Sequence, residues 1–186
     1  CAERLGRNLP PSMAFAPIGG DVVVHPGEVE ARAGLYAFGS FLKAIQLARS
    51  SQVAGVVTLP IHKASWHQAG IPYRGHTEAL REIFGQEAIM VLGCPQMYVA
   101  LFTEHVPLAE VCQRIRAEEL ESFLIRLARG FPFREAAVLG LNPHGGDEGV
   151  MGCEDGDVAE AIQRANERLE AERYWGPYVP DTAFTP

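Results

Sequence analysis

The stretch VLGLNPHGGDEGVMGCED, from Val138 to Asp155, decides how the fold of this sequence is interpreted. Its first four residues, Val138 to Leu141, are apolar and suit a buried strand. The run stops at Asn142-Pro143, and then come a single histidine, His144, and two glycines. In sheets whose strands alternate with helices, ligands bind where strands end and loops begin. The histidine therefore stands where a binding site is expected.

Apolar runs and amphipathic stretches alternate along the whole chain. The pattern predicts strands at 21–24, 53–59, 88–92, 98–102 and 138–141. Helices are predicted at 28–50, with breaks near two glycines, and at 77–84, 119–129 and 157–173. A further short helix is expected after Lys63. This alternation predicts an α/β fold, with a mostly parallel or mixed sheet flanked by helices.

Composition excludes several classes of protein. The chain has 186 residues and a net charge of -7, which argues against non-specific binding of nucleic acid. No stretch is apolar and long enough to span a bilayer, and no signal peptide is recognisable. The cysteines at 1, 94, 112 and 153 form no C-x-x-C pair. We therefore expect a cytoplasmic protein without membrane or nucleic-acid partners, whose cysteines are reduced and mostly packed.

Two histidines follow predicted strands and lie near prolines. His105 comes shortly before Pro107, and His144 comes directly after Pro143. Imidazole is the commonest metal ligand in proteins, and glycines after His144 would let a ligand approach closely. Spacing alone slightly favours two exposed loop histidines, because catalytic zinc usually has three protein ligands.

Two further positions suit an anionic ligand. His76 and Thr77 lie at a predicted helix start, where free backbone N–H groups bind anions and Thr77 can cap the helix. Lys63 follows a predicted strand and suits anion binding or proton transfer. Taken alone, an ordinary capping turn is the better explanation of His76 and Thr77, and a surface lysine is the alternative for Lys63. The glycine-rich fingerprints of phosphate and dinucleotide loops do not occur in the chain.

Four stretches in order carry a specific resemblance to a known family. They are GVVTLPIHKASWHQAGIPYRGHTEAL (55–80), VALFTEHVPLAEV (99–111), the stretch at 138–155 and PDTAFTP (180–186). Together they resemble the 4-hydroxythreonine-4-phosphate dehydrogenase (PdxA) family of pyridoxal phosphate biosynthesis. The resemblance implies a layered fold like that of the isocitrate and isopropylmalate dehydrogenases.

The resemblance also implies roles for individual residues. His105 and His144 match the two histidines that bind a divalent metal (Zn, Mg, Co or Mn) in the family. His76 and Thr77 match the pair that contacts substrate. Lys63 and Asp181 match residues expected near the substrate, as catalytic groups that we do not rank. The cofactor would be NAD or NADP, bound by residues that we cannot assign, and the enzyme would be a homodimer with its site at the subunit interface.

The sequence departs from the family pattern at several positions. Glu104 stands where the family has threonine, His62 where it has asparagine, and Asp147 where it has glutamate. The family's opening motif is missing, as is its later motif with a third metal histidine. We therefore expect residues 1–186 to be one incomplete α/β unit, the central part of such an enzyme, without activity when expressed alone.

Three functional interpretations remain open at this point. The first is the NAD-dependent, metal-dependent oxidation and decarboxylation of 4-hydroxythreonine 4-phosphate. The second is a related dehydrogenase that oxidises a four-carbon sugar-acid phosphate, threonate or erythronate 4-phosphate. The third is an inactive metal-binding or dimerising fragment.

Overall fold

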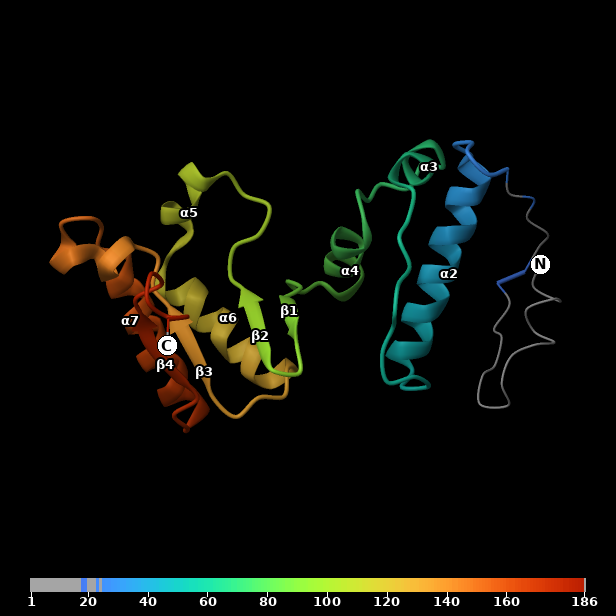
Figure 1. Ribbon diagram of the computed structural model, residues 1–186. Helices are drawn as coiled ribbons and strands as arrows, with labels where there is room; N and C mark the ends of the chain where they lie inside the picture. Colours follow the sequence, from blue (N-terminus) through green and yellow to red (C-terminus); the bar gives the residue numbers. More distant parts are fainter. Residues whose placement is uncertain (1–17, 20–22, 24, 186) are drawn as a thin grey trace. The chain divides into compact units, whose positions relative to one another are not determined.

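The computed structural model describes residues 18–19, 23 and 25–185 (Figure 1). Its contacts divide the chain into two compact units, Cys1–Ala88 and Ile89–Pro186. Of the strand predicted at 21–24, only Val23 is among the described residues, so that prediction falls largely outside them. Nowhere in the described part is a helix long and apolar enough to cross a membrane.

The described residues of the first unit form three helices around a small aromatic core. The helices are α2 (Ala31–Arg49), α3 (Lys63–Gln68) and α4 (His76–Phe84). Trp66 is fully buried at the centre, and the ring of Phe38 meets it edge-on at 5.1 Å between centroids. The buried core residues of this unit are Phe41, Ile45, Trp66, Ile71 and Ala79.

Helix α2 runs without a break through both of its glycines, contrary to the prediction from sequence. Gly34 is buried, and its missing side chain lets the backbone of α3 approach. A Cβ built on Gly34 would lie well inside 3.0 Å of the Ser65 carbonyl oxygen. The glycine therefore serves close helix packing, and it does not bend the helix.

We expect Gly34→Ala to destabilise the protein by about 1 kcal/mol. Alanine favours a helix by about 1 kcal/mol over glycine, but overpacking against fixed backbone costs about 1–3 kcal/mol and displaces α3. Gly39→Ala, on the same helix, is the matched control, because its Cβ would make only an ordinary 3.7 Å contact with Ile18. Denaturant unfolding should show the Gly39 variant unchanged or stabilised, and equal effects at both positions would contradict this account.

The strand predicted at 53–59 is absent from the structure. The segment is extended and mostly exposed, with Val57 96% and Leu59 81% accessible. A strand needs a neighbouring strand to pair with, and none is present beside this segment in the described residues. An apolar run alone does not reveal whether that neighbour exists.

The second unit contains two separate two-stranded sheets in place of one larger sheet. Strands β1 (Met90–Cys94) and β2 (Met97–Leu101) form an antiparallel hairpin. Strand β3 (Ala136–Leu139) pairs with β4 (Tyr174–Tyr178) in parallel. Helices α5 (Leu108–Arg114), α6 (Ala117–Gly130) and α7 (Glu154–Leu169) and the short turn η1 (Pro143–Gly149) complete the unit (Figure 1). The α/β class is as predicted, with a mixture of parallel and antiparallel pairs.

Helices α6 and α7 supply most of the second core. Leu120, Phe123, Leu124 and Leu127 recur on one face of α6, as the sequence predicted, and pack with Val158, Ala161, Ile162 and Ala165 of α7. The buried Tyr174 of β4 closes this core, and its hydroxyl donates a 2.6 Å hydrogen bond to the Leu124 carbonyl oxygen. Burial raises the pKa of Tyr174 to about 12.

Helix α7 begins earlier and ends earlier than predicted. Three acidic residues, Glu154, Asp155 and Asp157, occupy its first turn, where they stabilise the positive end of the helix. The helix ends because Glu170 takes a left-handed conformation and the Asn166 amide oxygen accepts hydrogen bonds from the following backbone. That change of direction places β4 beside β3.

Candidate functional site

The segment after β3 forms a left-handed turn that carries His144. Five consecutive residues, 144–148, have positive φ and ψ of zero or above, with φ between 46° and 80°. Three of them, His144, Asp147 and Glu148, are not glycine, and each such residue costs about 1–2 kcal/mol in this conformation. A turn of this kind persists only where its surroundings hold it firmly.

The start of α7 holds this turn in place. The Asp155 carboxylate accepts a 2.6 Å hydrogen bond from the Leu141 backbone N–H. The side chain of Asn142, which is buried, donates to the Glu154 carboxylate at 2.9 Å. That hydrogen bond is the main reason why the pKa of Glu154 is lowered. No role was predicted from the sequence for Asn142, Glu154 or Asp155, although two acids at a helix start are a recognisable signal.

His144 and Asp181 lie together, although 37 positions separate them. Oδ2 of Asp181 accepts a 2.7 Å hydrogen bond from the His144 backbone N–H and lies 3.2 Å from its Nδ1. The His144 side chain is 74% exposed, so the rest of its ring faces solvent. The contact joins a predicted metal ligand to a predicted catalytic residue.

His105 lies in the loop between β2 and α5, also with positive φ, at 54°. Its side chain is 85% exposed, and its Nδ1 lies 3.7 Å from the Glu104 carboxylate. Two exposed imidazoles on strained backbone are thus present in one unit. That they share one metal ion stays a prediction.

The described residues hold one group of three potential ligands whose donor atoms lie within 4.8 Å of one another. This group is His25, Glu28 and Glu30, and it includes neither His105 nor His144. The Glu30 carboxylate accepts a hydrogen bond from the His25 backbone and lies 2.9 Å from its Nδ1. These contacts lower the pKa of the Glu30 carboxyl, chiefly through the His25 side chain. They belong to the turn that precedes α2, which explains why the three residues lie together.

His76 and Thr77 begin helix α4, as predicted. The predicted cap at Thr77 is wrong, because the N-cap residue is Gly75 and makes no side-chain cap. The carboxylate of Glu78 instead accepts a 2.6 Å hydrogen bond from the Arg74 backbone N–H. A glutamate in the first turn that reaches back before the helix satisfies a free donor in the same way as half of a capping box.

The ring of His76 is packed against two aromatic side chains. Its centroid lies 5.0 Å from that of Phe41 and 5.5 Å from that of Trp66. Burial lowers the pKa of His76. The folded protein therefore favours the neutral form of the imidazole. The side chain is partly accessible at the start of α4.

We expect His76 to make the protein less stable in mild acid. As the pH falls below about 6.5, the unfolded chain takes up a proton that folded His76 resists, so stability is lost. His76→Phe keeps the aromatic packing and cannot titrate. Unfolding midpoints measured across this range should fall more steeply for the wild type, and parallel curves for both proteins would contradict the prediction.

Lys63 is the first residue of α3 and is exposed. The residue before it, His62, caps this helix, because its Nδ1 accepts a 3.3 Å hydrogen bond from the Ser65 backbone N–H. Asparagine is among the strongest capping residues, which gives a physical reason for the exchange between histidine and asparagine at position 62. The capping role was missed in the sequence, since histidine is not a usual cap.

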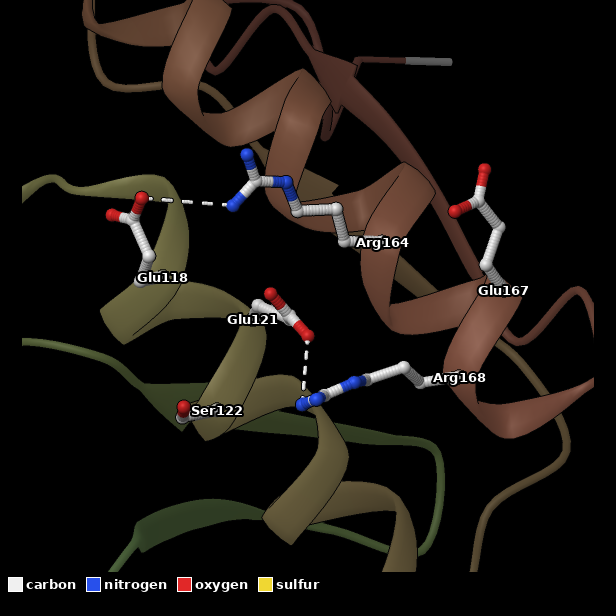
Figure 2. Close-up of a pocket in the computed structure, with 6 residues that line it drawn as sticks. All are labelled: Glu118, Glu121, Ser122, Arg164, Glu167 and Arg168. Atoms are coloured by element: carbon white, nitrogen blue, oxygen red, sulfur yellow. Dashed lines mark ion pairs between the residues drawn. The ribbon is translucent and has the colours of Figure 1, made fainter.

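A shallow groove between α6 and α7 carries only charged and polar side chains (Figure 2). Arg164 pairs with Glu118 at 3.6 Å, and Arg168 pairs with Glu121 at 3.1 Å. The Arg164–Glu118 pair is exposed, and exposed pairs contribute little to stability. None of the residues predicted to form a functional site lines the groove, so it is separate from the candidate site.

The three described cysteines, Cys94, Cys112 and Cys153, are free, as expected. All three are exposed, so the expectation that they pack in the interior is wrong. Lys63, His76 and Thr77 belong to the first unit, whereas His105, His144 and Asp181 belong to the second. The contact between His144 and Asp181 is the one that joins two predicted site residues in the described part of the chain.

Comparison with known proteins agrees with the motifs. A family model described as "Pyridoxal phosphate biosynthetic protein PdxA" matches residues 8–186. Proteins named 4-hydroxythreonine-4-phosphate dehydrogenase are 44% identical over 98% of this chain in Sulfurimonas denitrificans and 41% identical over 99% in Campylobacter fetus. The chain spans 59% and 60% of those relatives.

Solved structures give the same result. A crystal structure of 4-hydroxythreonine-4-phosphate dehydrogenase from Klebsiella pneumoniae is similar with a TM-score of 0.76 at 35% identity, over 87% of this chain and 50% of that one. The corresponding structure from Burkholderia phymatum has a TM-score of 0.73 at 27% identity, over 95% and 52% of the two chains. The chain therefore belongs to the PdxA family of pyridoxal phosphate biosynthetic proteins.

Proposed function

We propose that the protein containing this chain is a dehydrogenase that oxidises 4-hydroxythreonine 4-phosphate with NAD or NADP and releases carbon dioxide. The observation that carries the proposal is the His144–Asp181 pair on its strained turn, in a chain up to 44% identical to relatives with that name. Such strain is typical of functional sites.

The donor set fits a divalent metal. His105 and His144 are exposed imidazoles on backbone of positive φ, and a carboxylate lies against Nδ1 of His144. Histidines that bind metals almost always give their other ring nitrogen to such a partner. A metal bound there would act as a Lewis acid on the substrate's oxygen atoms.

The remaining site residues have roles in holding substrate and moving protons. His76 and Thr77 would orient the substrate from the start of α4, where the helix favours a negatively charged group. The exposed ammonium of Lys63 would assist proton transfer. When bound, NAD or NADP would supply the hydride acceptor for oxidation of the hydroxyl carbon, and a base would take the hydroxyl proton. The resulting β-keto acid would lose carbon dioxide and take up a proton to leave an amino ketone phosphate.

We further propose that the enzyme is a homodimer in the cytoplasm, with its site at the subunit interface. Residues 1–186 would form the central part of this longer enzyme. A third metal ligand would then come from outside this chain, as two histidines leave a catalytic site incomplete.

The direct test is reduction of NAD and NADP by the full-length protein, followed by absorbance. We expect turnover with 4-hydroxythreonine 4-phosphate, and loss of turnover after chelation of metal. Threonate and erythronate 4-phosphate are the competing substrates. A higher kcat/KM with either of them would assign the protein to the related sugar-acid reaction, and no turnover with any of the three would overturn the proposal.

A further inference from the structure

The parallel pair of strands β3 and β4 explains why His144 meets Asp181. Leu139, at the end of β3, is in register with Tyr178, at the end of β4. Both strands therefore leave the sheet at the same edge. His144 follows five residues after the first strand end, and Asp181 three residues after the second. The meeting is thus built into the sheet.

The segment that carries Asp181 is itself ordered by local hydrogen bonds. The Thr182 backbone N–H donates to the Val179 carbonyl oxygen at 3.3 Å, and that of Thr185 donates to the Thr182 carbonyl oxygen at 3.1 Å. The side chain of Val179 also lies close to the glycine that follows His144. The carboxylate is therefore presented from a defined turn to a histidine whose own backbone conformation is unusual.

A single oxygen of Asp181 contacts two nitrogen atoms of His144, the backbone N–H at 2.7 Å and Nδ1 at 3.2 Å. The negative charge of this carboxylate oxygen, so close to the ring, favours a proton on Nδ1. In a neutral imidazole the other nitrogen, Nε2, then bears the lone pair. The Asp181 contact selects one tautomer of the ring and also fixes its direction.

We infer that Asp181 is a positioning residue for His144, which holds the ring as the Nδ1–H tautomer with Nε2 directed outward as a donor for a divalent cation. The cation rests on the proposed function, whereas the choice of tautomer does not. This role differs from proton transfer to the substrate, because Asp181 acts through another side chain.

The two roles predict different consequences for metal binding. A residue that only transfers protons can be lost without any effect on the affinity for metal. Loss of a carboxylate that orients a metal-binding histidine typically lowers that affinity about 10–100-fold. Asp181→Asn keeps an oxygen that can accept from the backbone N–H and lie near Nδ1, but it loses the negative charge, so a positioning role predicts a milder loss than in Asp181→Ala.

The test is the tautomer of His144 in metal-free, full-length protein labelled with nitrogen-15 histidine. Ring nitrogen chemical shifts are measured by NMR at alkaline pH. His144→Ala identifies the His144 signals. We expect Nδ1–H in the wild type and a shift toward Nε2–H, the form that free imidazole prefers, in Asp181→Ala, with Asp181→Asn in between.

Asp147→Asn is the matched control. Asp147 lies in the same turn, and within the described residues its side chain makes no hydrogen bond or ion pair; asparagine tolerates its left-handed backbone equally well. This variant removes one negative charge beside His144 and should leave the tautomer unchanged. The same shift in the control, or an unchanged tautomer in a folded Asp181→Ala variant, would overturn the inference.

Zinc affinity, measured by competition with a chelator, separates failure of this inference from failure of the proposed function. We expect a 10–100-fold loss in Asp181→Ala and a larger loss in His144→Ala. Unchanged affinity in His144→Ala would refute the metal role of that histidine, while the tautomer result still decides the role of Asp181. A shifted His144 tautomer with unchanged zinc affinity in Asp181→Ala would overturn the link between the tautomer and metal binding.

Discussion

Replacing His144 by alanine is expected to reduce kcat/KM of the full-length enzyme about thousandfold or more. The variant loses an imidazole that the proposed function assigns to the metal, and Lewis-acid stabilisation contributes several kcal/mol to reactions of this type. The change should leave folding nearly intact, because the side chain is 74% exposed. Steady-state rates of NAD reduction measure the effect.

His67→Ala provides the matched control for this loss. His67 is also exposed, but it lies on α3, and its side chain forms no hydrogen bond or ion pair in the described part of the chain. We expect its kcat/KM to stay within about threefold of the wild type, since surface changes away from special features have small effects. Activity of His144→Ala within tenfold of the wild type would contradict a role for this residue in metal binding.

Gly146→Ala is expected to lower the free energy of unfolding by about 3 kcal/mol. Gly146 is buried in the left-handed turn with φ of +80°, which costs a non-glycine residue about 1–2 kcal/mol. In addition, the new Cβ would lie 2.6 Å from the carbonyl oxygen of Gly152, so backbone must move. Because that backbone leads into the acidic start of α7, the displacement also disturbs the support of His144.

Gly149→Ala separates strain from collision. Gly149 lies in the same turn with φ of +94°, but nothing is within 4 Å of a Cβ built there. The free energy of unfolding of this variant should fall only by the cost of the left-handed backbone, about 1–2 kcal/mol. Denaturant unfolding of both variants gives the comparison. Equal losses would mean that the close approach between Gly146 and Gly152 does not hold the turn.

Patterns that repeat within one element could be predicted from the sequence. The apolar spacing on α6 and the apolar runs of β1 and β2 gave correct elements, because local patterns reflect which side chains are buried. The strand predicted at 53–59 was wrong because strand formation depends on a pairing partner. An apolar run does not show whether that partner is present.

Features that depend on distant segments could not be predicted. Strand β4 contains Gly176 and Pro177, which argue against a strand, yet it pairs with β3 through an irregular register. The sequence placed His144 and Asp181 in one family site, but their contact depends on the pairing of these two strands. The left-handed turn likewise depends on Asn142 and on Asp155, which follows 14 positions after Leu141.

The central claim is that His105 and His144 bind the same divalent metal ion. The direct measurement is zinc affinity of the full-length protein, of each histidine-to-alanine variant and of the double variant, by competition with a chelator. A shared ion predicts that each single change loses about hundredfold or more and that the double change adds little, because ligands of one site are coupled. Losses that add independently, or single variants that bind zinc as tightly as the wild type, would contradict the claim.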